Sequence, residues 1–375
     1  MADAIDHEHM AHALQLAANG LYDTAPNPAV GCVLVKAGRV VGEGWTAPAG
    51  GPHAEIVALK AARAAARGAT AYVTLEPCCH TGRTGPCTKA LLEAGVVRVV
   101  FAGRDPNPRV NGGGAKELAA AGVAVEGGVM ERAAEPLNRG FFTRMQRGVP
   151  YVRSKLAVSL DGRTALANGE SQWITSAAAR ADVHRWRARS SAVVTGSGTI
   201  VDDDPSLDAR REEAQIPESL GVKQPLRVVI DARLKMPPGA KTLSRPGEVL
   251  VLTTRALDDP KAAALRAAGA RVDRIAGDAE HCDLKAVLEH LGKLEINDVW
   301  VEAGAGLNGA LLRAGLIDEL IIYMAPRLFG STARGMFEVP ALEALADATH
   351  VTFEDVRKVG ADLRITARVS SVPGA

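Results

Sequence analysis

Hydrophobic and polar positions recur with two different periods along the first half of this 375-residue chain. Alternating or continuous apolar runs predict strands, and apolar residues three or four positions apart predict helices. We expect a hairpin of strands 30–36 and 40–45 around Ala37-Gly38, followed by strands at 70–75, 96–101 and 123–126. Helices are predicted at 6–19, 53–66, 86–94 and 114–121. Alternation of this kind is typical of a layered α/β domain.

A second α/β series follows the segment 144–150, whose Gly148 and Pro150 predict a linker. Strands are expected at 151–159, 191–195, 226–231, 248–253, 270–275, 298–302 and 318–324, and an antiparallel pair within 349–369. Helices are expected at 176–189, 258–268, 283–293 and 307–314, and a surface loop at 208–224. We therefore predict two domains, residues 1–147 and 148–375.

The composition narrows the class of protein. Hydrophobic residues make up 47% and charged residues 23%, which is enough apolar material for a large core. The net charge of +1 and the 4% of aromatic residues argue against nucleic acid as a partner. No apolar run is long enough to span a membrane, and MADAIDHEHM has no signal-peptide pattern, so we expect a cytoplasmic enzyme without a membrane partner.

The cysteines suggest a metal site in the first half. The chain has five, and Cys78, Cys79 and Cys87 lie within ten residues, which favours metal binding over disulfides. His53 precedes them in the order typical of zinc deaminases, His-x-Glu and then Pro-Cys. A catalytic zinc takes three protein ligands and leaves one position for water, and Glu55 is suited to move a proton beside it.

Two alternatives to this zinc interpretation stay open. Eight residues separate Cys78 from Cys87, where the deaminase signature has two, and the site could be structural. Cys79 could also replace Cys78 as the ligand. The polar loop between Cys78 and Cys87 carries His80 and Arg83, which could reach a substrate phosphate.

The second half contains features that suit a nucleotide. The stretch 304–309 has the form G-x-G-x-x-G between a predicted strand and helix, and GSGT at 196–199 is a second glycine-rich strand end. No acidic residue follows about 20 positions later, which argues against an ordinary Rossmann domain. A simple glycine-rich turn is the alternative.

Charged residues near these glycines are candidates for chemistry. Glu302 ends a strand that looks buried, where an unpaired carboxylate is unfavourable. Arg187 and Arg210 suit a ribose phosphate, although solvated surface charge is the common fate of such residues. Lys155 and Asp203 are candidates for proton delivery, although Lys155 could instead extend to solvent.

Longer runs resemble one family, the bifunctional deaminase-reductases of riboflavin biosynthesis. Its deaminase half is matched by TAPNPAVGCVLVK (24–36), GGPHAEIVAL (50–59), ATAYVTLEPCCHTGRTGPC (69–87) and GRDPNPRVNGGG (103–114). Its reductase half is matched by NRGFFTRM (138–145), KLAVSLDGRTALANGESQWIT (155–175), ADVHRWRARSSAVVTGSGTIVDDDPSL (181–207) and VEAGAGLNGALL (301–312). The resemblance covers nearly the whole chain, and both halves appear in the family's order.

For the first domain, the resemblance implies a cytidine-deaminase-like, three-layer α/β/α fold. It implies one zinc ion on His53, Cys78 and Cys87, with Glu55 as the proton shuttle. The substrate would be 2,5-diamino-6-(5-phosphoribosylamino)pyrimidin-4(3H)-one, contacted by Asn27, His80 and Arg83. Two residues depart from the family's pattern: Cys79 replaces the usual Ser, and Thr46 stands where His is frequent.

For the second domain, the resemblance implies a dihydrofolate-reductase-like α/β fold that uses NADPH to reduce 5-amino-6-(5-phosphoribosylamino)uracil. The implied cofactor contacts are Ala157, Trp173, Thr199, Asp203, Gly304, Ala305, Gly306, Leu307, Asn308, Gly309 and Ala310. The implied substrate contacts are Ser171, Arg187, Leu207, Arg210 and Glu302, and the catalytic candidates are Lys155, Asp203 and Glu302. Ala232 stands where the family often has Ser. Family members also suggest a homo-oligomer formed through this domain.

Two other functions are compatible with the zinc motif taken alone. One is a tRNA deaminase with an unrelated second domain, which the near-neutral charge and the long loop disfavour. The other is a non-catalytic module that senses nucleotides, in which Glu55 would have no proton to move.

Overall fold

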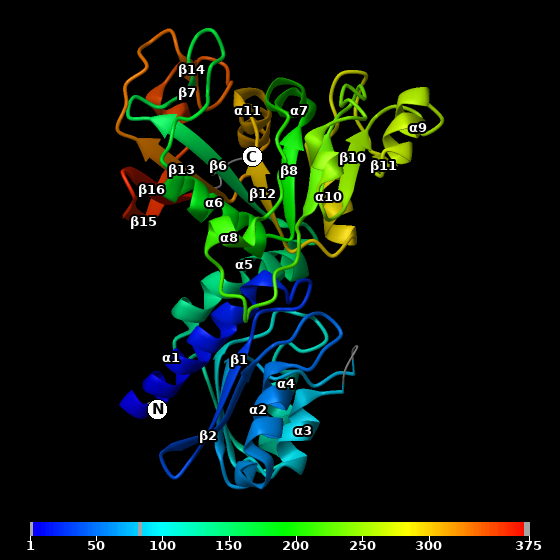
Figure 1. Cartoon of the computed structure of the whole chain (residues 1–375). Helices are drawn as coiled ribbons and strands as arrows, with labels where there is room; N and C mark the ends of the chain where they lie inside the picture. Colours follow the sequence, from blue (N-terminus) through cyan, green and yellow to red (C-terminus); the bar gives the residue numbers. More distant parts are fainter. Residues whose placement is uncertain (1–2, 82–84, 371–375) are drawn as a thin grey trace. The chain divides into compact units, whose positions relative to one another are not determined.

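The computed structural model describes residues 3–81 and 85–370, which fall into two compact units. The first unit contains residues up to Gly148 together with Glu218–Val222, and the second contains Val149–Pro217 and the chain from Lys223 onward. Both are α/β structures, and Figure 1 shows a sheet with helices packed against it in each. In the described part of the chain, no helix has the length and apolar character to cross a bilayer.

The first unit has a five-stranded sheet in the order β2-β1-β3-β4-β5. The strands are β1 (Gly31–Lys36), β2 (Arg39–Trp45), β3 (Thr70–Leu75), β4 (Arg98–Gly103) and β5 (Ala124–Gly127). The helices are α1 (Ala4–Asn19), α2 (Ala54–Ala62), α3 (Cys87–Glu93), α4 (Gly113–Ala120) and α5 (Glu131–Arg147), with 3-10 turns η1 (Gly20–Tyr22) and η2 (Arg63–Ala66). Strand β1 is antiparallel to β2 and β3, whereas β3, β4 and β5 are parallel.

Alternate side chains of this sheet enter two separate cores. In β1, Cys32 and Leu34 pack with α2, α3 and α4, whereas Val33 and Val35 pack with α1 and the first half of α5. Figure 1 shows these helices on the two faces of the sheet. The period of two in a strand produces this division, and the result is the three-layer arrangement that the family resemblance implies.

The strand directions bring four loops to one edge of the first sheet. Strand β1 starts, and β2 ends, where β3 and β4 end, since Gly31 pairs with Trp45 and its N–H donates to Thr74 Oγ1 at 3.1 Å. The segments before β1, after β2, after β3 and after β4 therefore meet there. These segments carry most of the predicted deaminase residues.

The second unit has a nine-stranded sheet in the order β11-β10-β9-β8-β12-β6-β13-β16-β15. Its strands are β6 (Tyr151–Ser159), β8 (Ala192–Gly196), β9 (Leu226–Ile230), β10 (Val249–Thr253), β11 (Arg271–Arg274), β12 (Asp298–Glu302), β13 (Glu319–Ala325), β15 (Val351–Val359) and β16 (Asp362–Val369). Only β16 and β15 break its parallel arrangement among the described strands. The short strands β7 (Arg163–Ala165) and β14 (Arg334–Gly335) form a separate pair.

Helices cover both faces of the second sheet. The helices are α6 (Ala177–Arg189), α7 (Ser197–Asp203), α8 (Arg211–Ala214), α9 (Pro260–Ala267), α10 (Leu284–Lys293) and α11 (Ala305–Arg313), with 3-10 turns η3 (Lys241–Ser244) and η4 (Leu345–Asp347). Side chains of α6 and α9 share one core with Trp300. Those of α10 and α11 share the other with Val299 and Val301, so β12 is buried on both faces.

Several elements differ from the sequence prediction. Helix α5 extends to Arg147 across the first part of the predicted linker 144–150, and it was missed because its sequence is polar and contains Pro136. The predicted loop 208–224 contains α8. The predicted helix 53–66 leaves α-geometry at Arg63, whose φ is 51°. Helix α7 forms directly after the glycine-rich strand end at 196–199, where no helix is predicted.

Candidate functional site

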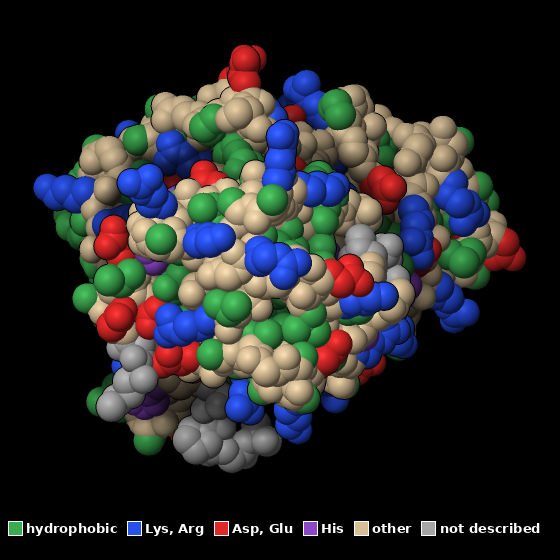
Figure 2. All heavy atoms as spheres, turned by 90° about the horizontal axis from the view of Figure 1, so that it is seen from below, with side chains coloured by type: hydrophobic (Ala, Val, Ile, Leu, Met, Phe, Trp, Pro, Cys, Tyr) green, Lys and Arg blue, Asp and Glu red, His purple; other side chains and the backbone are tan. Residues whose placement is uncertain are grey.

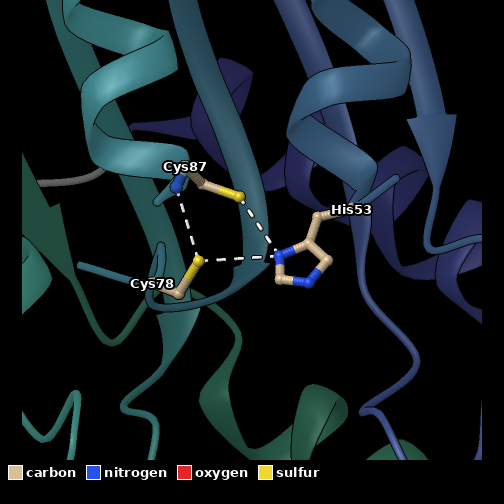
Figure 3. Close-up of side chains that lie close together, drawn as sticks. All are labelled: His53, Cys78 and Cys87. Atoms are coloured by element: carbon tan, nitrogen blue, oxygen red, sulfur yellow. Dashed lines mark hydrogen bonds between the residues drawn. The ribbon is translucent and has the colours of Figure 1, made fainter. Parts of the chain in front are cut away.

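Three potential metal ligands lie together in the first unit (Figure 3). His53 immediately precedes α2, Cys78 follows β3, and Cys87 is the first residue of α3. His53 Nδ1 lies 3.3 Å from Cys87 Sγ and 3.5 Å from Cys78 Sγ, and the Cys87 N–H donates to Cys78 Sγ at 3.4 Å. The ligand atoms all lie within 4.8 Å of one another.

This donor set fits zinc. Tetrahedral bonds of about 2.3 Å to sulfur and about 2.0 Å to nitrogen place ligand atoms roughly 3.5–3.8 Å apart, close to the observed spacings. Hydrogen bonds from Cys87 and His53 lower the pKa of the Cys78 thiol, which favours the thiolate that a metal needs, whereas the hydrogen bond to Cys78 and burial raise the pKa of the Cys87 thiol. Among the described residues, this is the one group of three His, Cys, Asp or Glu side chains with such geometry.

Glu55 lies in the first turn of α2, two residues from His53, and its side chain points into the interior. It is 3% exposed, and burial together with the nearby Cys78 charge raises its pKa to about 7. A carboxyl group with this pKa can both accept and release a proton near neutral pH. The buried Cys32 of β1 lies on the same side, and burial and the Glu55 charge raise the pKa of its thiol.

Cys79 is directed away from the three ligands. Its Sγ lies 3.6 Å from the Arg109 carbonyl oxygen, and a Cβ at Gly113 of α4 would come within 2.9 Å of it. The described structure therefore groups Cys78, and not Cys79, with His53 and Cys87.

A buried carboxylate next to Cys78 holds the neighbouring loop. Glu76 accepts hydrogen bonds from the backbone N–H groups of Gly112 and Ala115, both at 3.0 Å, and so fixes the start of α4. Gly114 is required there, because a Cβ would lie 2.0 Å from the Pro77 carbonyl oxygen. This contact fixes the segment that leads into Cys78.

Asp105 is a candidate site residue that sequence reasoning missed. It is buried, and burial raises its pKa to about 6. Asp105 follows the end of β4 by two residues, at the same edge of the sheet where β3 leads into Cys78. Its position just after the end of β4 was the available signal, because strand ends meet at this edge of the sheet.

The other predicted deaminase residues lie in the loops at this edge. Asn27 donates its backbone N–H to Thr24 and is half-buried. The Nδ1 of His80 is buried and has no hydrogen-bond partner among the described residues. Arg83 lies outside the described residues. Thr46 is buried and exchanges hydrogen bonds with the Val30 backbone, so it fastens the loop after β2.

In the second unit, Glu302 and Arg187 form a two-pronged ion pair. Arg187 Nε donates to Glu302 Oε1 at 2.5 Å and Nη2 donates to Oε2 at 2.9 Å. Burial pushes the pKa of Glu302 up, but Arg187 and Lys155 outweigh it and hold that pKa at about 2. Lys155 lies beside Glu302 in the register of β6 and β12, and burial lowers the pKa of its ammonium group. The sequence predicted all three residues but not this pairing.

The predicted phosphate ligand Arg210 is exposed and lies near His184. Its backbone N–H donates to His184 Nδ1 at 3.3 Å, and its guanidinium pairs with Glu213 at 2.6 Å. Burial, together with Arg187 and Arg210, lowers the pKa of His184 to about 4. Leu207, nearby in sequence, is buried with a φ of 56°.

The glycine-rich stretch 304–309 opens α11, with mixed roles for its residues. Asn308 is fully buried, and its amide accepts from Ser154 Oγ and donates to the Ala303 carbonyl oxygen. Gly309 allows close packing, because a Cβ there would lie 2.1 Å from the Glu338 carbonyl oxygen. At Gly304 nothing lies within 4 Å of an added Cβ, which leaves room for a ligand.

Two family models match the chain. Residues 3–103 match the cytidine and deoxycytidylate deaminase zinc-binding region, and residues 150–365 match the RibD C-terminal domain. The riboflavin biosynthesis protein RibD of Escherichia coli is 49% identical over 96% of this chain and 98% of its own length. The chain belongs to the RibD family.

Other RibD proteins support the same conclusion. RibD of Mycobacterium tuberculosis is 42% identical over 92% of this chain and 91% of its own. A solved Acinetobacter baumannii RibD structure superposes with a TM-score of 0.89 at 46% identity, over 98% of this chain and 99% of that one. The Thermotoga maritima diaminohydroxyphosphoribosylaminopyrimidine deaminase/5-amino-6-(5-phosphoribosylamino)uracil reductase gives 0.84 at 31% identity, over the same shares.

RibD membership confirms the predicted fold class and the predicted bifunctional enzyme. The chain combines a deaminase with a reductase of riboflavin biosynthesis. Its zinc-binding deaminase region and its reductase domain suggest zinc and a nicotinamide cofactor. The alternative of an unrelated second domain is wrong, because that half matches the RibD C-terminal domain.

The remaining residues that the RibD resemblance implies occupy varied positions. Trp173 is 64% exposed, with the Arg180 guanidinium 4.7 Å from its ring centre. Ala232 replaces the Ser that the resemblance leads us to expect at this position. Its carbonyl oxygen accepts hydrogen bonds from the hydroxyls of Thr253 and Thr254. Ala157 lies in β6, Ser171 precedes α6, Thr199 and Asp203 lie in α7, and Ala305, Gly306, Leu307 and Ala310 lie in α11.

Charged side chains of both signs occur on the face of the molecule that Figure 2 shows. Figure 2 shows one face of the molecule, on which basic and acidic side chains are interspersed. The formal net charge of the whole chain, +1, is likewise close to neutral.

Proposed function

We propose that this chain catalyses two successive reactions on a pyrimidine nucleotide. The first is hydrolytic deamination of 2,5-diamino-6-(5-phosphoribosylamino)pyrimidin-4(3H)-one, carried by residues 1–147. The second is NADPH-dependent reduction of the ribosyl group of 5-amino-6-(5-phosphoribosylamino)uracil to ribityl, carried by residues 148–375. The observation that supports this most directly is the cluster of His53, Cys78 and Cys87 with the buried Glu55 beside it.

In the deaminase, His53, Cys78 and Cys87 would hold one zinc ion per chain. Such an ion supplies an activated water when it is bound. Glu55 takes a proton from the attacking water and delivers it to the leaving amine, which its raised pKa permits near neutral pH. Water attack and loss of ammonia replace the amine with oxygen, and no further reactant is needed.

Loops at the same edge of the sheet would bind the substrate. Asn27 contacts the ring or ribose, and His80 and Arg83 reach the phosphate. The unpartnered His80 Nδ1 is consistent with a polar ligand at this point. Asp105, buried at the same edge of the sheet just after β4, is a further contact that we assign to the pyrimidine.

In the reductase, the ends of β8 and β12 would bind NADPH, which supplies the hydride for C1 of the sugar. We assign its contacts to Ala157, Trp173, Thr199, Asp203, Gly304, Ala305, Gly306, Leu307, Asn308, Gly309 and Ala310. We assign the substrate contacts to Ser171, Arg187, Leu207, Arg210 and Glu302. Lys155, with its lowered pKa, and Asp203 are the candidates for delivering the proton.

We also propose that the reductase unit associates with a second copy of the chain. Strand β15 is an edge of the nine-stranded sheet and exposes Val351, Phe353 and Val356, with Phe353 66% exposed. An exposed apolar edge strand favours pairing with another chain. Sedimentation of the full chain and of its Phe353→Asp variant tests this, since a monomeric wild type would contradict it.

Incubation of the full chain with the diaminopyrimidine nucleotide, with and without NADPH, tests the two reactions. Without NADPH, the product mass should change by the replacement of an amine with a hydroxyl. With NADPH, two further hydrogens should be gained. An unchanged nucleotide together with tight, salt-sensitive tRNA binding would favour a nucleic-acid deaminase instead.

A further inference from the structure

Trp300 donates its indole N–H to Glu302 Oε1 at 2.9 Å, two residues further along β12. The two side chains lie on the same face of the strand because successive side chains alternate. Trp300 is 0% exposed, so no water can replace this donor. We propose that Trp300 is a positioning residue of the reductase, which orients the Glu302 carboxylate for substrate. This inference rests on the proposed contact of Glu302 with the pyrimidine substrate.

The two carboxylate oxygens of Glu302 have different hydrogen-bond partners. Oε1 accepts from Trp300 Nε1 and from Arg187 Nε, whereas Oε2 accepts from Arg187 Nη2 alone within the described part of the chain. Each carboxylate oxygen has two lone pairs. Oε1 is therefore saturated, and Oε2 keeps acceptor capacity for a substrate hydroxyl or for Lys155 beside it.

Trp300 holds the Glu302 carboxylate from a different element than Arg187 does. Arg187 reaches the carboxylate from α6, and the indole reaches it from β12 itself, so two different elements fix the carboxylate plane. The Glu302 backbone is also held, because Thr195 Oγ1 donates to its carbonyl oxygen at 2.6 Å. Without the indole N–H, the carboxylate can rotate about the bond that joins it to the rest of the Glu302 side chain. Oε2 is then misplaced for the substrate.

A second tryptophan provides a matched control. Trp186 of α6 stacks on Trp300, with ring centres 5.2 Å apart and an angle of 9° between the planes. It is buried in the same core, and no hydrogen bond among the described residues joins it to Glu302. Replacing either indole by Phe perturbs the same stack, but only Trp300→Phe removes the donor.

The experiment compares W300F and W186F in the full-length protein by steady-state reductase kinetics. Loss of a donor to a charged group should raise the KM for the deaminated pyrimidine nucleotide roughly tenfold in W300F. The KM for NADPH should stay within about twofold, as should both constants in W186F. Equal effects of the two variants, or an unchanged KM in W300F, would overturn the proposal.

Two further proteins keep the result interpretable. If thermal unfolding shows that W300F is not folded, 3-benzothienylalanine at position 300 removes the N–H while it keeps the ring shape, and the same KM criterion applies. Glu302→Gln separates the two levels of the argument. Full reductase activity in E302Q refutes the substrate role of Glu302 and with it this inference, whereas impaired E302Q beside unimpaired W300F refutes the inference alone.

Discussion

The side-chain amide of Asn138 is bonded to both backbone groups of Ala29. Its Oδ1 accepts from the Ala29 N–H at 2.8 Å, and its Nδ2 donates to the Ala29 carbonyl oxygen at 2.9 Å. Asn138 interrupts the helical geometry of α5, with φ −127° and ψ 18°, and it is buried. Ala29 follows the proposed substrate contact Asn27 by two residues, so α5 fixes the loop that carries Asn27.

Replacing Asn138 by Ala should weaken the deaminase unit. The substitution leaves the buried N–H and C=O of Ala29 without partners, and we expect a loss of about 1–3 kcal/mol in the free energy of unfolding. Urea unfolding, monitored by the loss of deaminase activity, measures this change in the free energy of unfolding. The exposed Gln146→Ala on the same helix is the control, and an equal, small effect of both substitutions would contradict the prediction.

Glu55→Gln should abolish deamination and leave the metal bound. Glutamine cannot accept the proton from water, whereas His53, Cys78 and Cys87 remain unchanged. Deaminase assays and metal analysis of the purified variant test this. Retained deaminase activity would show that Glu55 is not the proton shuttle, and loss of about one zinc per chain would place Glu55 among the ligands.

Cys79→Ser and Cys78→Ser should behave differently. The Cys79 thiol faces the Arg109 carbonyl oxygen, to which a serine hydroxyl can also donate, so zinc content and deaminase activity should be retained. Cys78→Ser removes one of the three grouped ligands and should sharply reduce zinc content. Metal analysis of the two purified variants decides which cysteine is the ligand.

Acid should destabilise the first unit through Asp6. Hydrogen bonds from Arg98 at 2.6 and 2.8 Å outweigh burial and hold the pKa of Asp6 well below its usual range. The unfolded chain, with an Asp pKa of about 3.9, therefore binds more protons below about pH 5. The stabilisation is complete above that pH and is lost as the pH falls toward the folded pKa.

Urea unfolding of the wild type and of Asp6→Asn tests this pH dependence of the free energy of unfolding. The measurements run from about pH 3 to about pH 6, on both sides of the unfolded-state Asp pKa of about 3.9. The stability of the wild type should rise with pH over this range, and that of Asp6→Asn should rise less. Equal slopes would show that other carboxylates cause the acid sensitivity.

The cluster of His53, Cys78 and Cys87 could be predicted because each of its residues belongs to a recognisable local sequence pattern. His53 and Glu55 share the start of one helix, and Cys78 and Cys87 flank one loop, so local spacing carries the signal. Asp105 was missed because its relation to Cys78 depends on the parallel pairing of β3 and β4, which brings the two strand ends together.

The reductase residues were harder to interpret from the sequence. Glu302 and Arg187 are 115 residues apart, and each alone was compatible with either substrate or solvent. The glycines at 304–309 suggested a nucleotide, yet Gly309 is also required by the packing of Glu338. Helix α5 was read partly as a linker because Pro136 and its polar residues obscure the helical period.

The residue patterns alone predict two α/β series, a group of His, Cys and Cys with an adjacent acid, and a glycine-rich turn before a helix. The fold was needed to show which cysteine lies beside His53, that Arg187 pairs with Glu302, and that Asn138 is bonded to Ala29. The physical reason is that periodicity and short motifs express local geometry. Hydrogen bonds between distant residues depend on strand order and helix packing, which no local pattern specifies.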